Sequence, residues 1–171
     1  DLFWAAPKIG AMLQNLNWRL TVHELSSIVE SGEPMVLVYS EDWQAQVEEL
    51  KPTFTTVEHV VAMTNPGHDE SDFADRDAMS TVLEDIPELD MDDPWGIYYT
   101  GGTTGLPKGA VVTHGNVTWN SVNTIASWGI NGLHKAAVQL PFFHIGGPMI
   151  FMVPLVHTGG TNILCSGFDP D

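Results

Sequence analysis

The sequence has few of the residues on which several common functions depend. It contains one cysteine, Cys165, so no disulfide can form within the chain, and we expect a protein of a reducing, cytoplasmic compartment. Its 7 histidines show none of the spacings typical of a zinc site, so we expect no bound metal of that kind. The Gly-x-Ser-x-Gly motif is absent as well, which argues against a serine hydrolase of the α/β-hydrolase type.

Positive charge is also scarce. Lysine and arginine together number 6 against 22 aspartates and glutamates, which gives a formal net charge of −16. This imbalance repels nucleic acid and anionic membranes, so we expect neither as a partner. The excess of acid is typical of a halophilic protein, which works where salt screens charge strongly. An acidic protein from an ordinary medium is the alternative. Disorder is not expected, because 43% of the residues are hydrophobic.

Acidic residues are missing from one part of the chain altogether. Sixteen of the 22 lie within residues 41–93, whereas residues 94–168 contain none. A triphosphate carries about four negative charges, so a neighbouring carboxylate would weaken its binding. The acid-free stretch is therefore suited to an anion site, and it is also what a buried core would show. Its most apolar run, residues 136–157, contains three prolines and His144, which predicts buried elements and no membrane span.

Residues 98–109, Tyr-Tyr-Thr-Gly-Gly-Thr-Thr-Gly-Leu-Pro-Lys-Gly, are the most informative stretch. Glycines let backbone N–H groups close around an anion, while threonine hydroxyls and a lysine add further donors. This is not a P-loop, because Lys108 follows a proline and β-prone residues follow it. The loop is predicted to join two strands at about 95–100 and 110–113. A hairpin without a ligand is the alternative. The candidate phosphate-binding residues are Thr100, Gly101, Gly102, Thr103, Thr104, Gly105 and Lys108.

Three blocks of the sequence resemble conserved blocks of the adenylate-forming superfamily and occur in the same order along the chain. This superfamily includes acyl-CoA synthetases, luciferases and peptide-synthetase adenylation domains. Residues 99–109 resemble its phosphate loop, residues 5–12 with 17–21 an earlier conserved block, and residues 140–147 a later aromatic–histidine block. Gly101 stands where the family usually has serine, a variation associated with fatty-acyl-CoA synthetases. The blocks cover nearly the whole chain.

The resemblance implies an α/β fold, part of the family's large N-terminal domain, and a chemistry. ATP with Mg²⁺ would react with a carboxylic acid to give an acyl adenylate and pyrophosphate, and coenzyme A would then displace AMP. By the same resemblance Lys108 is the catalytic residue that contacts the β- and γ-phosphates. Phe143, His144 and Gly146 would lie beside the acyl pocket and the thiol channel. Apolar neighbours such as Phe142 and Ile145 favour a fatty or aryl acid as the substrate.

The resembled enzymes are several times longer than 171 residues. Their adenine-binding block, and the C-terminal domain with its catalytic lysine, do not occur in this sequence. We therefore interpret residues 1–171 as a single partial domain of a larger ligase, inactive alone and able to self-associate through an open apolar seam. The alternative is a non-enzymatic module that keeps the fold and binds a nucleotide or a partner chain.

The predicted elements alternate, as in an α/β protein with a mostly parallel sheet and flanking helices. Thr21 and Glu24 form a capping box that opens a helix to about Ser31, where Gly32 should stop it. A strand at 35–39, expected to be covered on both faces, precedes a helix at 41–51 and a strand at 57–63. Residues 65–93 read as an acidic surface excursion with a short helix near 73–83. The remaining elements are a helix at 115–128 capped by Thr113, a strand at 136–140, a helix at 147–157 and a strand at 160–164.

Overall fold

The computed structural model describes residues 1–63, 86–101, 107–165 and 167. They fall into two compact units, each with its own core. The first unit comprises Asp1–Asn17, Pro87–Tyr98 and Ala110–Asp171; the second comprises Trp18–Ile86 and Tyr99–Gly109. The helix predicted near 73–83, and most of the acidic excursion around it, lie outside the described residues.

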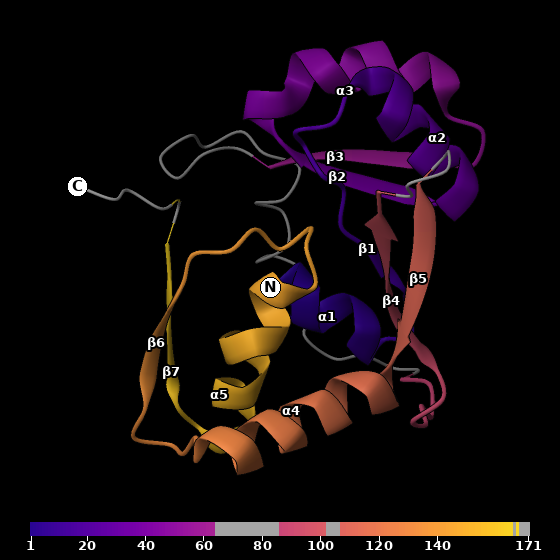
Figure 1. The fold of residues 1–171 in the computed structure, drawn as a ribbon. Helices are drawn as coiled ribbons and strands as arrows, with labels where there is room; N and C mark the ends of the chain where they lie inside the picture. The colour runs from indigo at the N-terminus through magenta and orange to yellow at the C-terminus, as the bar shows by residue number, and fades with distance from the viewer. Residues whose placement is uncertain (64–85, 102–106, 166, 168–171) are drawn as a thin grey trace. The chain divides into compact units, whose positions relative to one another are not determined.

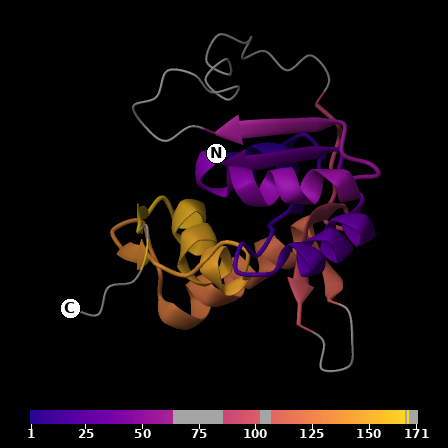
Figure 2. The same ribbon diagram turned by 90° about the horizontal axis from the view of Figure 1, so that it is seen from above.

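The second unit contains the predicted β–α–β arrangement. β2 and β3 pair in parallel, with Val36 opposite His59 and Ser40 opposite Met63, and they run side by side in both views (Figures 1 and 2). α3 packs against α2 and β2. Buried side chains from the helices and from β2 form the core: Leu25, Ile28, Val29, Leu37, Val47 and Leu50. The elements are α2 (Val22–Gly32), β2 (Val36–Ser40), η1 (Glu41–Trp43), α3 (Gln44–Leu50), η2 (Lys51–Thr53) and β3 (His59–Met63).

The start of α2 is as predicted, but its end is not. Thr21 and Glu24 form a full capping box: the backbone N–H of Thr21 donates to Glu24 Oε2 at 2.8 Å, and that of Glu24 donates to Thr21 Oγ1 at 3.3 Å. Gly32 stays within the helix. Glu33, with φ of 47°, takes the left-handed position that closes α2, and its N–H bonds to the carbonyl of Val29. The left-handed residue that ends α2 therefore lies one position after the glycine.

The expectation that β2 is covered on both faces is wrong. Leu37 is buried, whereas Val36 is 51% exposed. Successive side chains of a strand point to opposite faces, so Leu37 packs in the core on one face, while the other face is only partly covered: Val36 is exposed and Val38 is half-buried. A continuous apolar run predicted a strand correctly here and overstated its burial.

In its described residues, the first unit combines two small sheets with three helices and a π-helical turn (Figure 1). The two strands that flank the loop each extend two residues into the second unit. β1, β4 and β5 form one sheet in that order, and β6 pairs with β7 in a second. The β1–β4 and β6–β7 pairs are parallel, which agrees with the mostly parallel sheet that was predicted, although no strand was predicted at β1. The elements are α1 (Leu2–Lys8), β1 (Leu13–Gln14), β4 (Pro94–Thr100), β5 (Lys108–Thr113), α4 (His114–Trp128), β6 (Lys135–Val138), η4 (Pro148–Met152), α5 (Val153–Thr158) and β7 (Thr161–Leu164).

The helix predicted at 147–157 is divided into η4, a π-helical turn, and α5. Pro154 lies next to this junction. It has no N–H to donate, and its ring crowds the carbonyl of Ile150 four residues earlier, so regular α-helical bonding cannot run through this point. The widened turn precedes the proline directly.

The core of the first unit is rich in aromatic and methionine side chains. Phe3 and Trp95 meet edge to face with ring centroids 4.5 Å apart, and Tyr98 is 3% exposed. Trp95 and Tyr98, which lie on the strand before the loop, are thus core residues. Burial raises the pKa of Tyr98 to about 12, an effect that the Asn15 side chain opposes. Within the described residues, no helix has the length and hydropathy needed to cross a membrane.

Candidate functional site

The phosphate-loop candidate connects two strands, as predicted. β4 ends at Thr100 and β5 begins at Lys108. Thr100 Oγ1 donates a long, 3.5 Å hydrogen bond to the main-chain oxygen of Lys108, so the structure brings these two residues together at the mouth of the loop. Gly101 is exposed, and a Cβ placed on it would meet no heavy atom of the described residues within 4 Å. Packing therefore leaves the space beside Gly101 open.

The remaining loop candidates, Gly102, Thr103, Thr104 and Gly105, lie outside the described residues, and their role stays a prediction. Lys108 itself is exposed and forms no ion pair with any residue that the structure describes. Its ammonium group is thus available to an anionic ligand, in a stretch of sequence without carboxylates.

A tight turn precedes η4 and holds the predicted acid-site residues. The N–H of His144 donates to the carbonyl of Pro141 at 3.2 Å, and that of Gly147 donates to the carbonyl of His144 at 2.9 Å. The backbone N–H of Gly146 donates to His144 Nδ1 at 3.1 Å, which fixes the imidazole over the turn. A Cβ on Gly147 would clash with the Pro141 carbonyl oxygen, so glycine is needed there for close approach.

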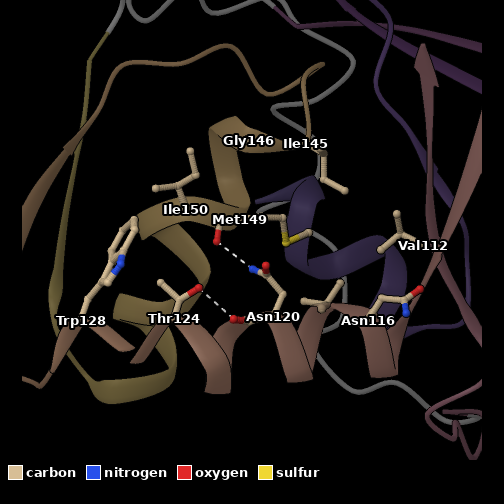
Figure 3. Close-up of a pocket in the computed structure, with 10 residues that line it drawn as sticks. Val112, Asn116, Asn120, Thr124, Trp128, Ile145, Gly146, Met149 and Ile150 are labelled. Carbon is tan, nitrogen blue, oxygen red and sulfur yellow. Dashed lines mark hydrogen bonds between the residues drawn. The ribbon is translucent and has the colours of Figure 1, made fainter. Parts of the chain in front are cut away.

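A cavity of about 560 Å³ lies between α4, this turn and η4 (Figure 3). Four of its lining residues recur at every fourth position of α4 and so share one face of the helix. Apolar side chains from the turn and from η4 form the opposite wall. The lining residues are Val112, Asn116, Val117, Asn120, Thr124, Trp128, Ile145, Gly146, Met149 and Ile150.

Hydrogen bonds orient the polar side chains of this cavity. Asn120 Nδ2 donates to the main-chain oxygen of Met149 at 3.0 Å, which ties α4 to η4 (Figure 3). Thr124 Oγ1 donates to the main-chain oxygen of Asn120 at 2.9 Å. Asn116 belongs to the capping box of α4, because its Oδ1 accepts from the N–H of Thr113 at 3.1 Å. Thr113 Oγ1 in turn accepts from the N–H of Asn116 at 3.2 Å, which confirms Thr113 as the predicted cap.

The predicted acid-site residues relate to this cavity in different ways. Gly146 lines it, whereas Phe143 and His144 do not. His144 is exposed on the turn, and Phe143 is partly buried. Sequence reasoning missed the residues on α4, Asn116, Asn120, Thr124 and Trp128. Their spacing of four within a predicted helix was a usable signal, because it places polar side chains in one line on one face.

Acidic, histidine and cysteine side chains do not gather anywhere in the described part of the chain as three potential metal ligands. Cys165 is half-buried beside Leu164, which is 64% exposed, so the thiol is not enclosed in the core. The cavity and the mouth of the loop are two places in the described residues whose side chains suit a ligand.

Comparison with known proteins identifies the family. The model of the AMP-binding enzymes matches residues 2–171. The chain belongs to this family. The predicted resemblance to adenylate-forming enzymes is thereby confirmed, and so is the α/β fold of their N-terminal domain.

Individual relatives agree with this assignment. The chain is 32% identical to a feruloyl-CoA synthase of Amycolatopsis sp over 170 residues, which cover 99% of this chain and 32% of the relative. It is 30% identical to an indoleacetate–CoA ligase of Aromatoleum aromaticum, covering 98% of this chain and 33% of that protein. The crystal structure of ATP-bound MatB from Rhodopseudomonas palustris superimposes with a TM-score of 0.83 at 26% identity, over 99% of this chain and 33% of MatB. The chain thus spans about a third of the length of these relatives.

Proposed function

We propose that the chain provides the phosphate-binding loop and one wall of the acid pocket in an AMP-forming acid–thiol ligase. The enzyme would activate a carboxylic acid with ATP as an acyl adenylate and pass the acyl group to coenzyme A. The observation that carries this proposal is the match of the family model to residues 2–171, which include both the loop and the turn before η4. Activity would require the complete ligase.

Lys108 has an electrostatic role in this reaction. When the acid attacks the α-phosphate of ATP, negative charge builds up on the departing pyrophosphate, and a positioned ammonium group stabilises that charge. Thr100, at the other side of the loop mouth, would add a hydroxyl that donates to a phosphate oxygen once it gives up its long, 3.5 Å bond to the main-chain oxygen of Lys108. Mg²⁺, which accompanies ATP, would share the neutralisation of the same oxygens. The absence of carboxylates from residues 94–168 keeps opposing charge out of this part of the sequence.

The cavity along α4 is proposed to receive the apolar part of the acid. Its volume of about 560 Å³ lies in the range of roughly 300–1,000 Å³ that small-molecule sites occupy. Two of the relatives carry the names of aromatic acids, ferulate and indoleacetate, in their activities. His144 and Phe143, on the turn beside the cavity but not in its lining, are proposed to shape the entry of the acid or the thiol.

Acid-dependent exchange of pyrophosphate into ATP tests the proposal in the full-length ligase. Lys108→Ala should reduce the exchange rate by about a hundredfold or more, the usual effect of removing one preorganised electrostatic donor. Lys135→Ala, which removes an exposed lysine from β6 in the same acid-free stretch, is the matched control and should leave the rate unchanged. Normal exchange in Lys108→Ala would refute the assigned role. Nucleotide binding without exchange for any acid would support the non-enzymatic alternative.

A further inference from the structure

We propose that the cavity along α4 selects aromatic acids whose ring carries a hydrogen-bond donor, a hydroxyl or an amino group, and that Asn120 and Thr124 determine this selection. The inference rests on the proposed function and goes beyond it by naming the substrate class. It follows from the hydrogen bonds that the two side chains already make within the protein.

Asn120 can offer the cavity only an acceptor. Its partner at 3.0 Å is the main-chain oxygen of Met149, and a carbonyl oxygen accepts but never donates. The amide nitrogen of Asn120 must therefore face Met149, and this settles which way round the side-chain amide lies. Its Oδ1 makes no hydrogen bond with the described residues, and it is the group left to meet a ligand.

Thr124, one helical turn further along, also presents only a hydrogen-bond acceptor to the cavity. A hydroxyl group has one hydrogen, and the structure commits it to the main-chain oxygen of Asn120 at 2.9 Å. The lone pairs of Oγ1 remain. Because Asn120 and Thr124 are four residues apart, they lie on one face of α4, and both line the cavity (Figure 3). Two acceptors side by side favour a ligand that donates.

Asn116, one turn before Asn120, has the opposite polarity. Its Oδ1 is occupied by the N–H of Thr113, so its amide nitrogen is the group left over. The lining stripe of α4 is therefore polarised, with a donor towards the start of the helix and acceptors towards its end. An acid that places its carboxyl group nearer Asn116 and its ring donor nearer Asn120 and Thr124 satisfies both ends.

The rest of the lining favours a flat ring. Trp128 and Met149 lie on different walls of the cavity, with Ile145 and Ile150 completing the apolar surface (Figure 3). Indole and thioether groups make favourable contacts with the edge or face of an aromatic ring. Asn120 is exposed and Thr124 is half-buried, so water can bond to both acceptors. A plain alkyl chain would gain the apolar contacts but would displace that water without replacing its hydrogen bonds, which a site built from oriented polar groups discriminates against.

Three acids of nearly equal shape test this inference in the full-length ligase: para-hydroxycinnamate, para-methoxycinnamate and cinnamate. We expect kcat/KM for adenylate formation to favour the hydroxylated acid by about tenfold or more, because the methoxy group can only accept and cinnamate has no substituent. Thr124→Val, which keeps the side-chain shape and removes the acceptor, should reduce that preference, and Thr124→Ser should restore it. Asn120→Leu should lower it further, whereas Asn123→Leu, an exposed site on the same helix outside the lining, should not.

Equal or greater activity with para-methoxycinnamate or cinnamate would overturn the inference and leave the ligase assignment intact. Failure of exchange with every acid would refute the proposed function instead. The preference can still be measured in that case, by equilibrium binding of the same acids followed through quenching of Trp128 fluorescence, with Trp128→Phe to identify the signal. Tighter binding of para-hydroxycinnamate than of the other two would then support a donor-selecting cavity, and equal binding would refute it.

Discussion

Ser121 Oγ lies 3.0 Å from His157 Nδ1, and this contact joins α4 to α5 beside the helix face that lines the cavity. The two partners are in very different surroundings. Ser121 has an exposed fraction of 0%, whereas His157 is exposed. Without the contact, the imidazole can bond to water and the buried hydroxyl cannot. Removal of the partner therefore costs Ser121 a hydrogen bond that water cannot replace, whereas His157 can bond to water instead.

This inequality predicts the order of two substitutions. His157→Ala leaves a buried hydroxyl without its partner and should lower the free energy of unfolding by about 1–3 kcal/mol. Ser121→Ala removes the buried polar group itself and should cost about 1 kcal/mol or less, since His157 remains hydrated. Urea unfolding of both variants, followed by circular dichroism, measures the difference.

The double variant supplies the control for that pair. Ser121→Ala combined with His157→Ala should be more stable than the sum of the single effects indicates, because no unpaired hydroxyl remains. Strict additivity would show that the contact contributes nothing. A larger loss for Ser121→Ala than for His157→Ala would contradict the argument from burial.

The capping box of α2 predicts a pH effect with a definite sign. The backbone N–H of Thr21 and then its hydroxyl, both hydrogen-bonded to the carboxylate of Glu24, lower the pKa of Glu24 below its ordinary value of 4.5. A lowered pKa in the folded state contributes stability above the unfolded pKa, and that contribution is lost as the pH falls through the folded value. The cap should therefore stabilise the fold at neutral pH and progressively less below about pH 4.5.

Because the chain has many other carboxylates, the measurement is a difference. The gap in Tm between the native protein and Glu24→Gln should be present at neutral pH and should shrink as the pH is lowered. Glu30→Gln, on the same helix and outside the cap, is the matched control. A gap that stays constant down to the acid unfolding transition would show that the carboxylate of Glu24 does not titrate with folding.

Features encoded by neighbouring residues were predictable from the sequence, and the capping boxes are the clearest examples. Thr21 with Glu24, and Thr113 at the start of α4, satisfy backbone N–H groups within one turn, so the pattern and the structure have the same cause. The loop between β4 and β5 is similar, because a proline before Lys108 and β-prone residues after it exclude a helix locally. The parallel pairing of β2 and β3 followed from a single helix between two apolar strands.

Features that depend on contacts between distant residues were missed. Asn120 reads as an ordinary polar residue of an amphipathic helix until its bond to Met149, 29 positions away, is seen. The exposure of Val36 depends equally on which neighbours cover the sheet, and an apolar run carries no information about that. Glu33 is a further example: it takes the left-handed conformation that the sequence pattern assigns to the glycine before it.

The charge balance predicts a response to salt. We propose that the excess of 22 acidic residues over 6 basic ones destabilises the fold in dilute solution, since like charges repel more strongly when screening is weak. The Tm should then rise from low salt to molar potassium chloride. A non-ionic osmolyte such as sucrose is the control, because it favours burial without screening charge. A Tm unaffected by potassium chloride would contradict a halophilic adaptation.

The loop mouth predicts how this chain by itself responds to magnesium ATP. Lys108 is exposed and unpaired among the described residues, and Thr100 lies across from it, so both can turn to a phosphate. Equilibrium titration in molar potassium chloride should give saturable binding that Lys108→Ala weakens by about tenfold or more, the usual worth of a hydrogen bond to a charged group. Lys135→Ala should bind as the native chain does. If both substitutions weakened ATP binding equally, the attraction would come from positive charge in general and not from Lys108 at the loop. If the folded chain did not bind magnesium ATP, the loop would bind phosphate only when the adenine-binding part of the ligase completes the site.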